Sequence, residues 1–346
     1  MTALVAPLFA GPIDVVGDVH GEKHALESLM ARLGYSHHGE HRQGRRLVFV
    51  GDLVDRGPDS PAVLRFVKKL VERDLAQCVA GNHELNLLRR QKKHGNHWFY
   101  GEPTAQHRAE FGDCAWLAPS EQAPVLEFLD SLPLALERQD LRVVHAAWHE
   151  DSVAACRGVV GSTLDVYLKH DRRVEAELIE SGIKQAAMDQ QAAIADALKD
   201  PSRQVPFLEH LALYDAQYQL RNPVRVISSG VERPATEPFY ASGKWRMVER
   251  VPWWRDYAHA VPVVFGHYWR WWTPDAHGRY SKGEANLFTD VEPGGWLPTA
   301  GREGAFCLDY SVGARFKERL EGRREPFHGR LAAMRWPERE LVFDSW

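Results

Sequence analysis

Short apolar runs recur along the chain, and each ends at a small residue that is followed by Asp, His or Asn. The five runs are Ile13 to Val16 before Gly17-Asp18-Val19-His20, Leu47 to Val50 before Gly51-Asp52, Gln77 to Ala80 before Gly81-Asn82-His83, Leu141 to Val144 before His145, and Val261 to Phe265 before Gly266-His267. Apolar runs of this length, rich in Val and bounded by Gly, are typical of strands buried on both faces. In α/β sheets, functional groups collect at the carboxyl ends of such strands.

Helical patterns separate the first three runs. Lys23 to Leu33 places its apolar side chains on one face and is followed by Gly34, a helix stop. Ser60-Pro61 is typical of an N-cap and a first-turn proline, for a helix that runs to about Arg73. A third helix is expected from His83 or Glu84 toward Lys93. This alternation predicts βαβ units, and therefore an α/β fold.

The pattern changes to long, polar, Ala- and Glu-rich helical segments in the middle of the chain. These segments are Ser162 to Ser181, Ile183 to Lys199 and Pro206 to Leu220. Strand-like runs resume at Gly304 to Tyr310, Leu331 to Trp336 and Glu340 to Phe343. We therefore expect a catalytic domain formed by residues 1–150 and 256–346, and a mainly helical insertion or cap formed by residues 151–255.

Composition and charge narrow the classes of partner. The 346 residues are 44% hydrophobic and 26% charged, with a formal net charge of −4 and no long basic block, which disfavours double-stranded nucleic acid. The four cysteines form no CxxC pair and are expected to be buried free thiols. No apolar run approaches the ~18 residues of a membrane span, and no basic residue precedes the first apolar stretch. We expect a cytoplasmic protein without membrane contact; no pattern selects an oligomeric state.

The first two strand ends carry carboxylates and an imidazole. Asp18 and His20 are two residues apart, so both side chains can turn toward one point, and this pair suits a divalent ion such as Mn, Fe or Zn. A polar turn after a strand is the structural alternative. Asp52 stands at the equivalent position after the second strand, and Asp55 and Arg56 follow in a loop bounded by glycines. A surface ion pair is the alternative for Asp55 and Arg56.

The remaining strand ends add Asn82, His83, His145 and His267. The amide oxygen of Asn82 can bind a hard ion, and His83 stands at a helix start, where a phosphate is also favoured. Each of these residues, taken alone, has a purely structural alternative, as a helix cap or as a core histidine whose hydrogen bonds are satisfied. Their joint occurrence is hard to attribute to packing, because buried ionisable groups cost several kcal/mol unless they are paired. A pair of cations is the economical explanation.

The ordered set GDVHG, GDLVDRG, GNHE, a strand-end His and GH resembles the calcineurin-like metallophosphoesterase superfamily. The resemblance is closest to its phosphoprotein phosphatase branch, which includes serine/threonine protein phosphatases and bacterial diadenosine tetraphosphatases. It covers residues 13–148 and roughly 261–312. It implies a four-layer αββα sandwich, in agreement with the alternation of strands and helices.

The resemblance also implies a role for each motif residue. Asp18, His20 and Asp52 would hold a first metal ion, and Asp52, Asn82, His145 and His267 a second, so that Asp52 bridges the two. His83 would be the catalytic general acid, Asp55 the carboxylate that orients it, and Arg56, with Asn82, would bind the substrate phosphate. The ions, expected to be Mn with Fe or Zn as alternatives, would activate a bridging hydroxide for in-line attack on phosphorus.

Two departures bear on the substrate. Trp269 stands where other branches continue the GH motif as GHxH, which favours the phosphatase branch. Protein phosphatases of eukaryotes carry a SAPNY-like segment near the C-terminus, whereas this chain has Phe306-Cys307-Leu308-Asp309-Tyr310-Ser311-Val312-Gly313, which is more similar to the diadenosine tetraphosphatases. The second phosphate-binding arginine is left open among Arg225, Arg233, Arg246, Arg250 and Arg255.

Aromatic residues gather around the last histidine, at Trp245, Trp253, Trp254, Tyr257, Tyr268, Trp269, Trp271 and Trp272. They either stack on a nucleobase or pack the insertion onto the sandwich, and packing is the favoured reading. The leading hypothesis is a two-metal phosphoesterase that hydrolyses monoesters of a phosphoprotein or a small phosphorylated metabolite. The alternative is a dinucleoside polyphosphate hydrolase or phosphodiesterase. A non-catalytic scaffold is remote, because every ligand position is retained.

Overall fold

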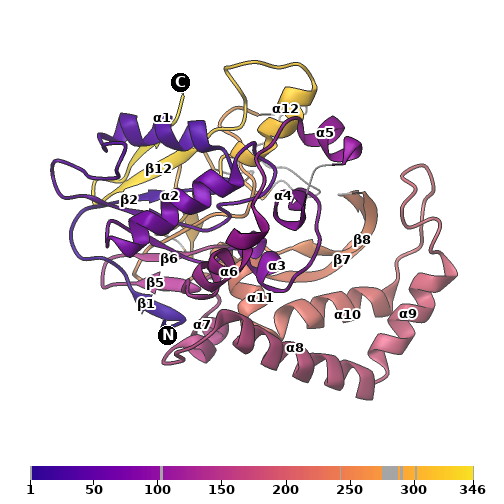
Figure 1. Cartoon of the computed structure of the whole chain (residues 1–346). Coiled ribbons are helices and arrows are strands. Elements are labelled where there is room, and N and C mark those ends of the chain that lie inside the picture. Colours follow the sequence, from indigo (N-terminus) through magenta and orange to yellow (C-terminus); the bar gives the residue numbers. More distant parts are fainter. Residues whose placement is uncertain are drawn as a thin grey trace.

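Two β-sheets face each other at the centre of the computed structural model, which describes residues 2–101, 104–241, 243–274, 287–288, 291–300 and 302–345 (Figure 1). The first sheet has the strand order β1 (Val5–Pro7), β5 (Ala135–Glu137), β6 (Arg142–Val144), β9 (Val263–Phe265), β11 (Arg302–Cys307), β10 (Leu297–Thr299). The second has the order β13 (Glu340–Phe343), β12 (Ala332–Trp336), β2 (Ile13–Val16), β3 (Arg46–Phe49), β4 (Ala76–Cys78). The predicted strand runs are thus confirmed, each within a few residues.

The two sheets share one apolar core. Val15 and Val48 of the second sheet lie in the same buried cluster as Val264 and Phe306 of the first. Their neighbours along the strands, such as Val16, belong to a second cluster that includes the helices outside the sheets. Strands buried on both faces account for the uninterrupted apolar runs of the sequence. The predicted αββα sandwich is confirmed.

The helices α1 (Lys23–Leu33) and α2 (Ser60–Glu72) cover the outer face of the five-stranded sheet (Figure 1). α1 ends as predicted at Gly34, whose φ of 92° is left-handed. The predicted N-cap of α2 is wrong by one residue, because the cap is Asp59, whose carboxylate accepts the N–H of Ala62. Ser60 is instead the first helical residue, and its hydroxyl accepts the N–H of Asp55.

The third helix is shorter than predicted. α3 spans Asn82–Leu88 and does not continue to Lys93, because Arg90 adopts a φ of 55°, which no α-helix tolerates. The elements that follow up to β5 are α4 (His97–Tyr100), α5 (Ala105–Phe111), the 3₁₀ turn η1 (Pro119–Glu121) and α6 (Gln122–Asp130). The C-terminal part contributes η3 (Val312–Ala314) and α12 (Arg315–Leu320).

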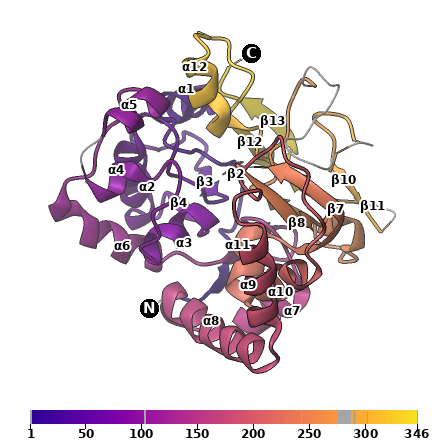
Figure 2. The ribbon, with the colours of Figure 1, turned by 90° about the vertical axis from the view of Figure 1, so that its right-hand side faces the viewer.

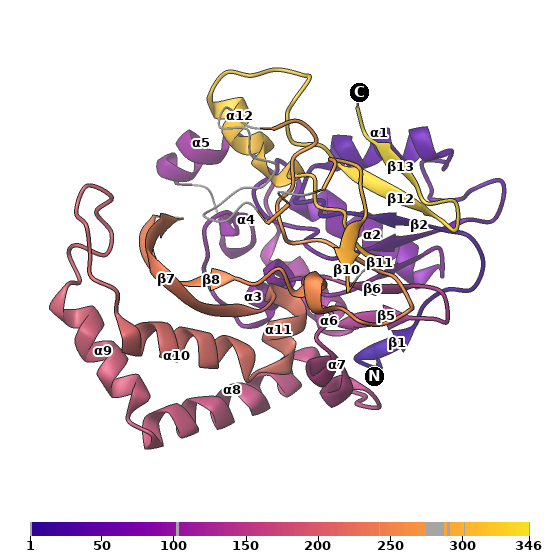
Figure 3. The same ribbon diagram turned by 180° about the vertical axis from the view of Figure 1, so that it is seen from behind.

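The segment 151–255 contains the long helices predicted for it and also a β-hairpin. Its elements are α7 (Glu150–Cys156), α8 (Thr163–Glu180), α9 (Ile183–Ala193), α10 (Glu209–Leu220), α11 (Pro223–Ser229), β7 (Glu232–Ala241), β8 (Lys244–Arg250) and η2 (Trp253–Asp256). Figures 2 and 3 show α8, α9 and α10 extending away from the sandwich, with the curved hairpin beside α10. Pro234 and Pro238 within β7 obscured its strand pattern in the sequence.

A small apolar core belongs to this segment alone. Met247 of the hairpin packs with Leu198, Leu208 and Ala212. Cys78, Cys156 and Cys307 are free and buried as expected, whereas Cys114 is half-buried. Within the described ranges, no helix is both long enough and apolar enough to cross a membrane.

Candidate metal centre

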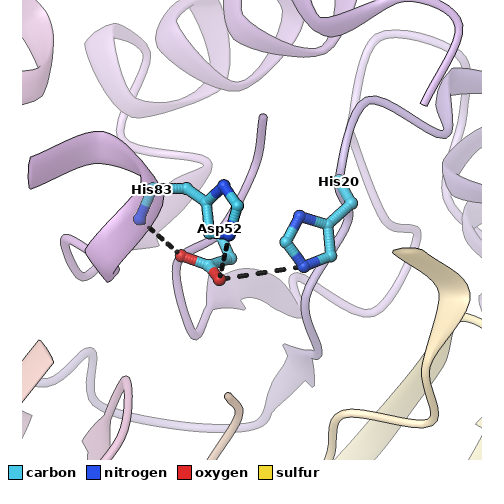
Figure 4. Close-up of side chains that lie close together, drawn as sticks. All are labelled: His20, Asp52 and His83. Atoms are coloured by element: carbon cyan, nitrogen blue, oxygen red, sulfur yellow. Dashed lines mark hydrogen bonds and ion pairs between the residues drawn. The ribbon is translucent and has the colours of Figure 1, made fainter. Parts of the chain in front are cut away.

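The six residues predicted as metal ligands meet at the carboxyl ends of strands from both sheets. Asp18 and His20 follow β2, Asp52 follows β3, Asn82 starts α3 after β4, His145 follows β6 and His267 follows β9. Figure 4 shows three side chains of this centre, with His20 and His83 on either side of the Asp52 carboxylate.

Asp52 lies at the middle of the cluster. Its Oδ1 is 3.3 Å from His145 Nε2, and its Oδ2 is 3.7 Å from Nε2 of both His20 and His83. Within the described part of the chain, two groups of buried side chains are spaced closely enough to hold an ion: His20, Asp52 and His83, and Asp52, His145 and His267. Asp52 belongs to both groups, as the bridging role requires.

Backbone carbonyls fix the orientation of two imidazoles. Nδ1 of His20 donates to the Val54 carbonyl at 2.9 Å, and Nδ1 of His145 donates to the Val50 carbonyl at 2.7 Å. In each ring Nε2 is therefore the nitrogen that faces the centre. A ring nitrogen held this way is the usual arrangement of a metal-binding histidine.

Asn82 and Asp18 complete the cluster from opposite sides. The amide oxygen of Asn82 lies 3.2 Å from His145 Nε2 and 2.8 Å from His267 Nδ1, which places it with the second group. Asp18 Oδ2 lies 3.9 Å from His20 Nε2 and accepts the His267 N–H at 3.1 Å. Imidazole, carboxylate and amide ligands together suit divalent ions such as Mn, Fe or Zn.

The electrostatics of the site call for cations. Burial, followed by the nearby carboxylates of Asp309 and Asp52, raises the pKa of Asp18 well above its ordinary value. Burial alone would also raise the pKa of Asp52, but His145 and His83 outweigh it and hold that pKa well below its ordinary value. Three buried carboxylates in contact range repel one another unless positive charge lies between them. Bound divalent ions would supply that charge.

Asp309 is a site residue to which the motif analysis gave no role. It follows β11, is buried, and has a pKa raised to about 6, first by burial. Its Oδ1 accepts the Ser311 N–H at 2.8 Å, while Oδ2 is buried without a hydrogen-bond partner within the described residues. The segment Leu308 to Gly313 carried the signal in the sequence, as part of the resemblance to the diadenosine tetraphosphatases.

Glu84 was also missed as a functional residue. Its buried carboxylate accepts the N–H groups of Asp52 at 2.9 Å, Leu53 at 2.8 Å and Gly81 at 2.9 Å. These bonds join the loop after β3 to the start of α3, so Glu84 positions Asp52. The last letter of the GNHE motif was the available signal.

Left-handed backbone conformations are concentrated at the site. His20, Asp52, Asp55, Arg56 and His267 have φ values of 47°, 47°, 74°, 71° and 67°. Such conformations cost of order 1–3 kcal/mol each for non-glycine residues and persist where the surrounding structure enforces them. Gly266 and Gly81 allow the close approach, because a Cβ on either would collide with Asp18 or Asp52.

The predicted catalytic residues lie over the first group of ligands. His83 Nδ1 pairs with Asp55 Oδ2 at 2.5 Å. The Arg56 guanidinium reaches Nε2 of His20 at 2.7 Å and Nε2 of His83 at 3.0 Å, and lies 4.8 Å over the Trp269 ring. His83 itself lies within ligand range of His20 and Asp52, so geometry alone leaves it two roles, proton donor and metal ligand.

Among the five candidate second arginines, Arg250 acts electrostatically on the centre. It is the first electrostatic contributor, after burial, to the lowered pKa of His267, and it lies 5.5 Å over the Tyr268 ring. Arg225 pairs with Asp171 and Arg233 with Glu249, so both guanidinium groups already have a carboxylate partner. The tertiary structure thus distinguishes among arginines that their spacing in the sequence left equivalent.

Most of the aromatic residues near His267 pack against the sandwich. Trp254 is buried between Phe265 and Phe288, with ring centroids 5.4 Å away in each case, and the Trp253 indole donates to the Ala146 carbonyl. Trp272 packs on Phe343. Trp269 differs from these, because the guanidinium of the catalytic candidate Arg56 lies over its ring.

Comparison with known proteins agrees with this geometry. The family model described as calcineurin-like phosphoesterase matches residues 11–228. The asymmetrical bis(5′-nucleosyl)-tetraphosphatase PrpE of Oceanobacillus iheyensis is 35% identical over 147 residues, which cover 39% of this chain and 54% of that protein. The symmetrical bis(5′-nucleosyl)-tetraphosphatase of Vibrio cholerae is 36% identical over 132 residues, covering 38% and 43% respectively.

The matches to these relatives are partial: this chain spans about half the length of each. Among solved structures, a cold-active protein tyrosine phosphatase of a psychrophilic Shewanella species aligns with 99% of this chain and 82% of its own. Its sequence identity is 14% and its TM-score 0.41, a likeness too low to bear on function.

Proposed function

Because this chain belongs to the calcineurin-like phosphoesterase family, we propose that its metal centre hydrolyses the phosphoanhydride chain of dinucleoside polyphosphates. The reaction adds water across one P–O–P link, so that one phosphorus gains the hydroxyl and the other retains the bridging oxygen. The relatives that share the motif-bearing part of the chain are named bis(5′-nucleosyl)-tetraphosphatases, which supports this substrate over a phosphoprotein.

The observation that carries the proposal is the position of Asp52 in two buried ligand groups. We assign Asp18, His20 and Asp52 to one divalent ion and Asp52, Asn82, His145 and His267 to the other. Mn is the proposed metal, with Fe or Zn as alternatives. When bound, such ions supply an activated water and offset negative charge on the phosphoryl group.

Side chains of the protein would donate a proton to the leaving oxygen and bind the phosphoryl oxygens of the substrate. His83, held by Asp55 through Nδ1, would donate a proton from Nε2 to the leaving phosphate oxygen once Arg56, which lies 3.0 Å from Nε2, turns to the substrate, a contribution of roughly 10²- to 10⁴-fold. Arg56 lies beside His83 and would bind a phosphoryl oxygen with its guanidinium. Arg250, which packs over the Tyr268 ring and acts electrostatically on His267, is the proposed second arginine for the same phosphate.

A phosphomonoesterase is the second candidate function. The same ligands, proton donor and arginines serve a monoester, and nothing in the metal centre itself requires a second nucleoside. The two activities differ in the leaving group, which is a large polyanion in the first case and a single alkoxide or phenoxide in the second.

The test compares three substrates on protein stripped of metal and resupplied with Mn: diadenosine tetraphosphate, an aryl phosphate monoester and an aryl diester. We expect the tetraphosphate to have the highest kcat/KM, and its products, ATP with AMP or two ADP, to identify the cleaved link. Asp52→Asn should abolish turnover, whereas the exposed Asp74→Asn should not. Preference for the monoester would overturn the proposed substrate, and full activity in Asp52→Asn would overturn the site.

A further inference from the structure

A cavity of about 330 Å³ opens beside the metal centre, between α3 and the segment 151–255. Asn82 lines it and is also the ligand candidate next to His145 and His267, so the cavity and the centre are contiguous. α3 contacts α11, as Figures 1 and 3 show from opposite sides. No catalytic residue proposed above, other than Asn82, lies in its wall.

One face of α3 leads from the centre into the cavity. Asn82, Asn86 and Arg89 are spaced by four and then three residues, which places them along the same side of the helix. Seven residues of helix rise about 10 Å. Arg89 therefore lies roughly that far from the ligand Asn82, at the end of the same polar row.

The opposite wall holds a guanidinium in a fixed position. Arg225 of α11 lies 4.0 Å over the Tyr218 ring and 5.0 Å over the Tyr167 ring, and its Nη2 donates to Asp171 at 3.0 Å. Its buried Nε has no hydrogen-bond partner within the described part of the chain. The guanidinium of Arg89 lies over the same Tyr167 ring, at 4.3 Å. Two arginines are thus brought to one phenol ring.

Further cations act on Lys93, which lines the cavity. The pKa of this side chain is lowered by burial and then by Arg89, Lys244, Arg225 and Arg246. Lys244 and Arg246 belong to the hairpin strand β8, so the hairpin contributes charge to the same place. The acidic groups that act on these cations are Asp171 on Arg89, and Asp215 and Glu232 on Lys244. Like charges held together at a cavity wall favour an anionic ligand.

We propose that this cavity is a polyphosphate subsite, which binds the phosphate groups of the substrate that are not being hydrolysed. This inference rests on the proposed function and deepens it, because it names what holds the remainder of the chain. It also gives the segment 151–255 a role, because α10 and α11 supply Tyr218, Arg225 and Ser229 to a wall that the sandwich alone leaves open. A monoester, which has a single phosphate, would not reach the subsite.

The alternative is that these cations only support packing of the tyrosines. Arg225 packs on two of these tyrosine rings and binds Asp171, so its replacement would also disturb Asp171. Arg89→Gln and Lys93→Gln are therefore the informative variants. Within the described part of the chain, neither side chain donates a hydrogen bond to a protein acceptor. Arg90→Gln and Lys92→Gln are the matched controls, since both residues are exposed neighbours that do not line the cavity.

The kinetic experiment measures kcat/KM for diadenosine tetraphosphate and for an aryl phosphate monoester with these four variants in the Mn-loaded full chain. We expect Arg89→Gln and Lys93→Gln each to lower the tetraphosphate value by about ten- to hundredfold, because each removes a charge-assisted hydrogen bond. The monoester value should stay within about twofold, and both controls should match wild type. Equal losses for both substrates, or no loss for either, would overturn the subsite.

A binding experiment separates failure of the subsite from failure of the proposed function. Calorimetry on the same Mn-loaded proteins would compare orthophosphate with a triphosphate whose bridging oxygens are methylene groups. Tighter binding of the triphosphate by wild type, lost in Arg89→Gln and Lys93→Gln, would support the subsite even if diadenosine tetraphosphate were not cleaved. Equal affinity of the two ligands in wild type would overturn the subsite, whatever substrate the metal centre prefers.

Discussion

Trp98 donates its indole N–H to Oδ1 of Asp55 at 2.7 Å, on the opposite side of the carboxylate from His83. Both oxygens of Asp55 are thus engaged, since Oδ2 pairs with His83 Nδ1. Trp98 and Asp55 are both buried, so the carboxylate has little freedom to rotate away. The orientation of His83 over the ligand cluster is therefore set by a chain of two hydrogen bonds that begins in α4.

We predict that Asp55→Asn lowers kcat about 10- to 100-fold without changing metal content. The amide keeps the shape of the carboxylate but no longer stabilises protonated His83, so the proton donor weakens. Trp98→Phe should have a smaller effect, because it removes only the second hydrogen bond. Steady-state kinetics with elemental analysis of bound metal would check both; a loss of metal in Asp55→Asn would contradict the orienting role.

His83→Ala distinguishes the two roles that geometry allows this residue. As proton donor, its loss should lower kcat by roughly 10²- to 10⁴-fold while both metal ions remain bound. The loss should be larger for an alkyl phosphate monoester than for a nitrophenyl ester, because the alkoxide needs a proton to depart and the nitrophenolate does not. Metal content reduced by one ion per chain would instead identify His83 as a ligand.

The decrease of the free energy of unfolding at acid pH should arise in part from His97. Its pKa is lowered to about 4, first by burial and then by His107. Because the folded state favours neutral His97, the stabilisation is present above about pH 6.5 and is lost as the pH falls toward 4. In metal-free protein, urea unfolding at pH 7 and pH 5 should show a difference of at most about 2 kcal/mol from this group.

His97→Phe should shrink that pH 7 to pH 5 difference, because the aromatic ring keeps the contacts with Phe111 and Trp116 but does not titrate. His24→Phe is the control, since the His24 side chain is 94% exposed. An unchanged difference in His97→Phe would contradict the assignment.

A buried ion pair in the five-stranded sheet should contribute strongly to stability. Asp14, in the middle of β2, is fully buried and accepts hydrogen bonds from Arg45 at 2.8 Å and from the Tyr35 hydroxyl at 2.7 Å. Asp14→Ala removes the buried partner of the Arg45 guanidinium and leaves it only the exposed carboxylate of Glu338, 2.8 Å away, so we predict a loss of about 3–5 kcal/mol in the free energy of unfolding.

Tyr35→Phe removes one hydrogen bond to the same carboxylate and should cost less, about 1.5–3 kcal/mol. Urea denaturation of both variants measures these values. A cost below about 1 kcal/mol for Asp14→Ala would show that Arg45 finds water or Glu338 as a sufficient partner.

The sequence by itself predicted the strands, the first helices and the polar residues that the candidate metal centre brings together. Strand ends such as Val16 and Val50 are readable because a strand buried on both faces must be apolar throughout, and the polar residue that follows it then stands out. The motif around Asp52 and the GNHE segment supplied the candidate ligands through their resemblance to a known family. Local pattern suffices where a residue's role depends on its immediate neighbours.

Only the tertiary structure decided which distant groups meet. His145 and His267 follow strands of one sheet and Asp52 follows a strand of the other, so their contact depends on how the sheets face each other. The hairpin β7–β8, the contact of Arg250 with Tyr268 and the convergence of Arg89 and Arg225 on one cavity likewise depend on packing across long chain separations. Spacing along a sequence does not encode these distances, because they are fixed by the burial of apolar surface between elements.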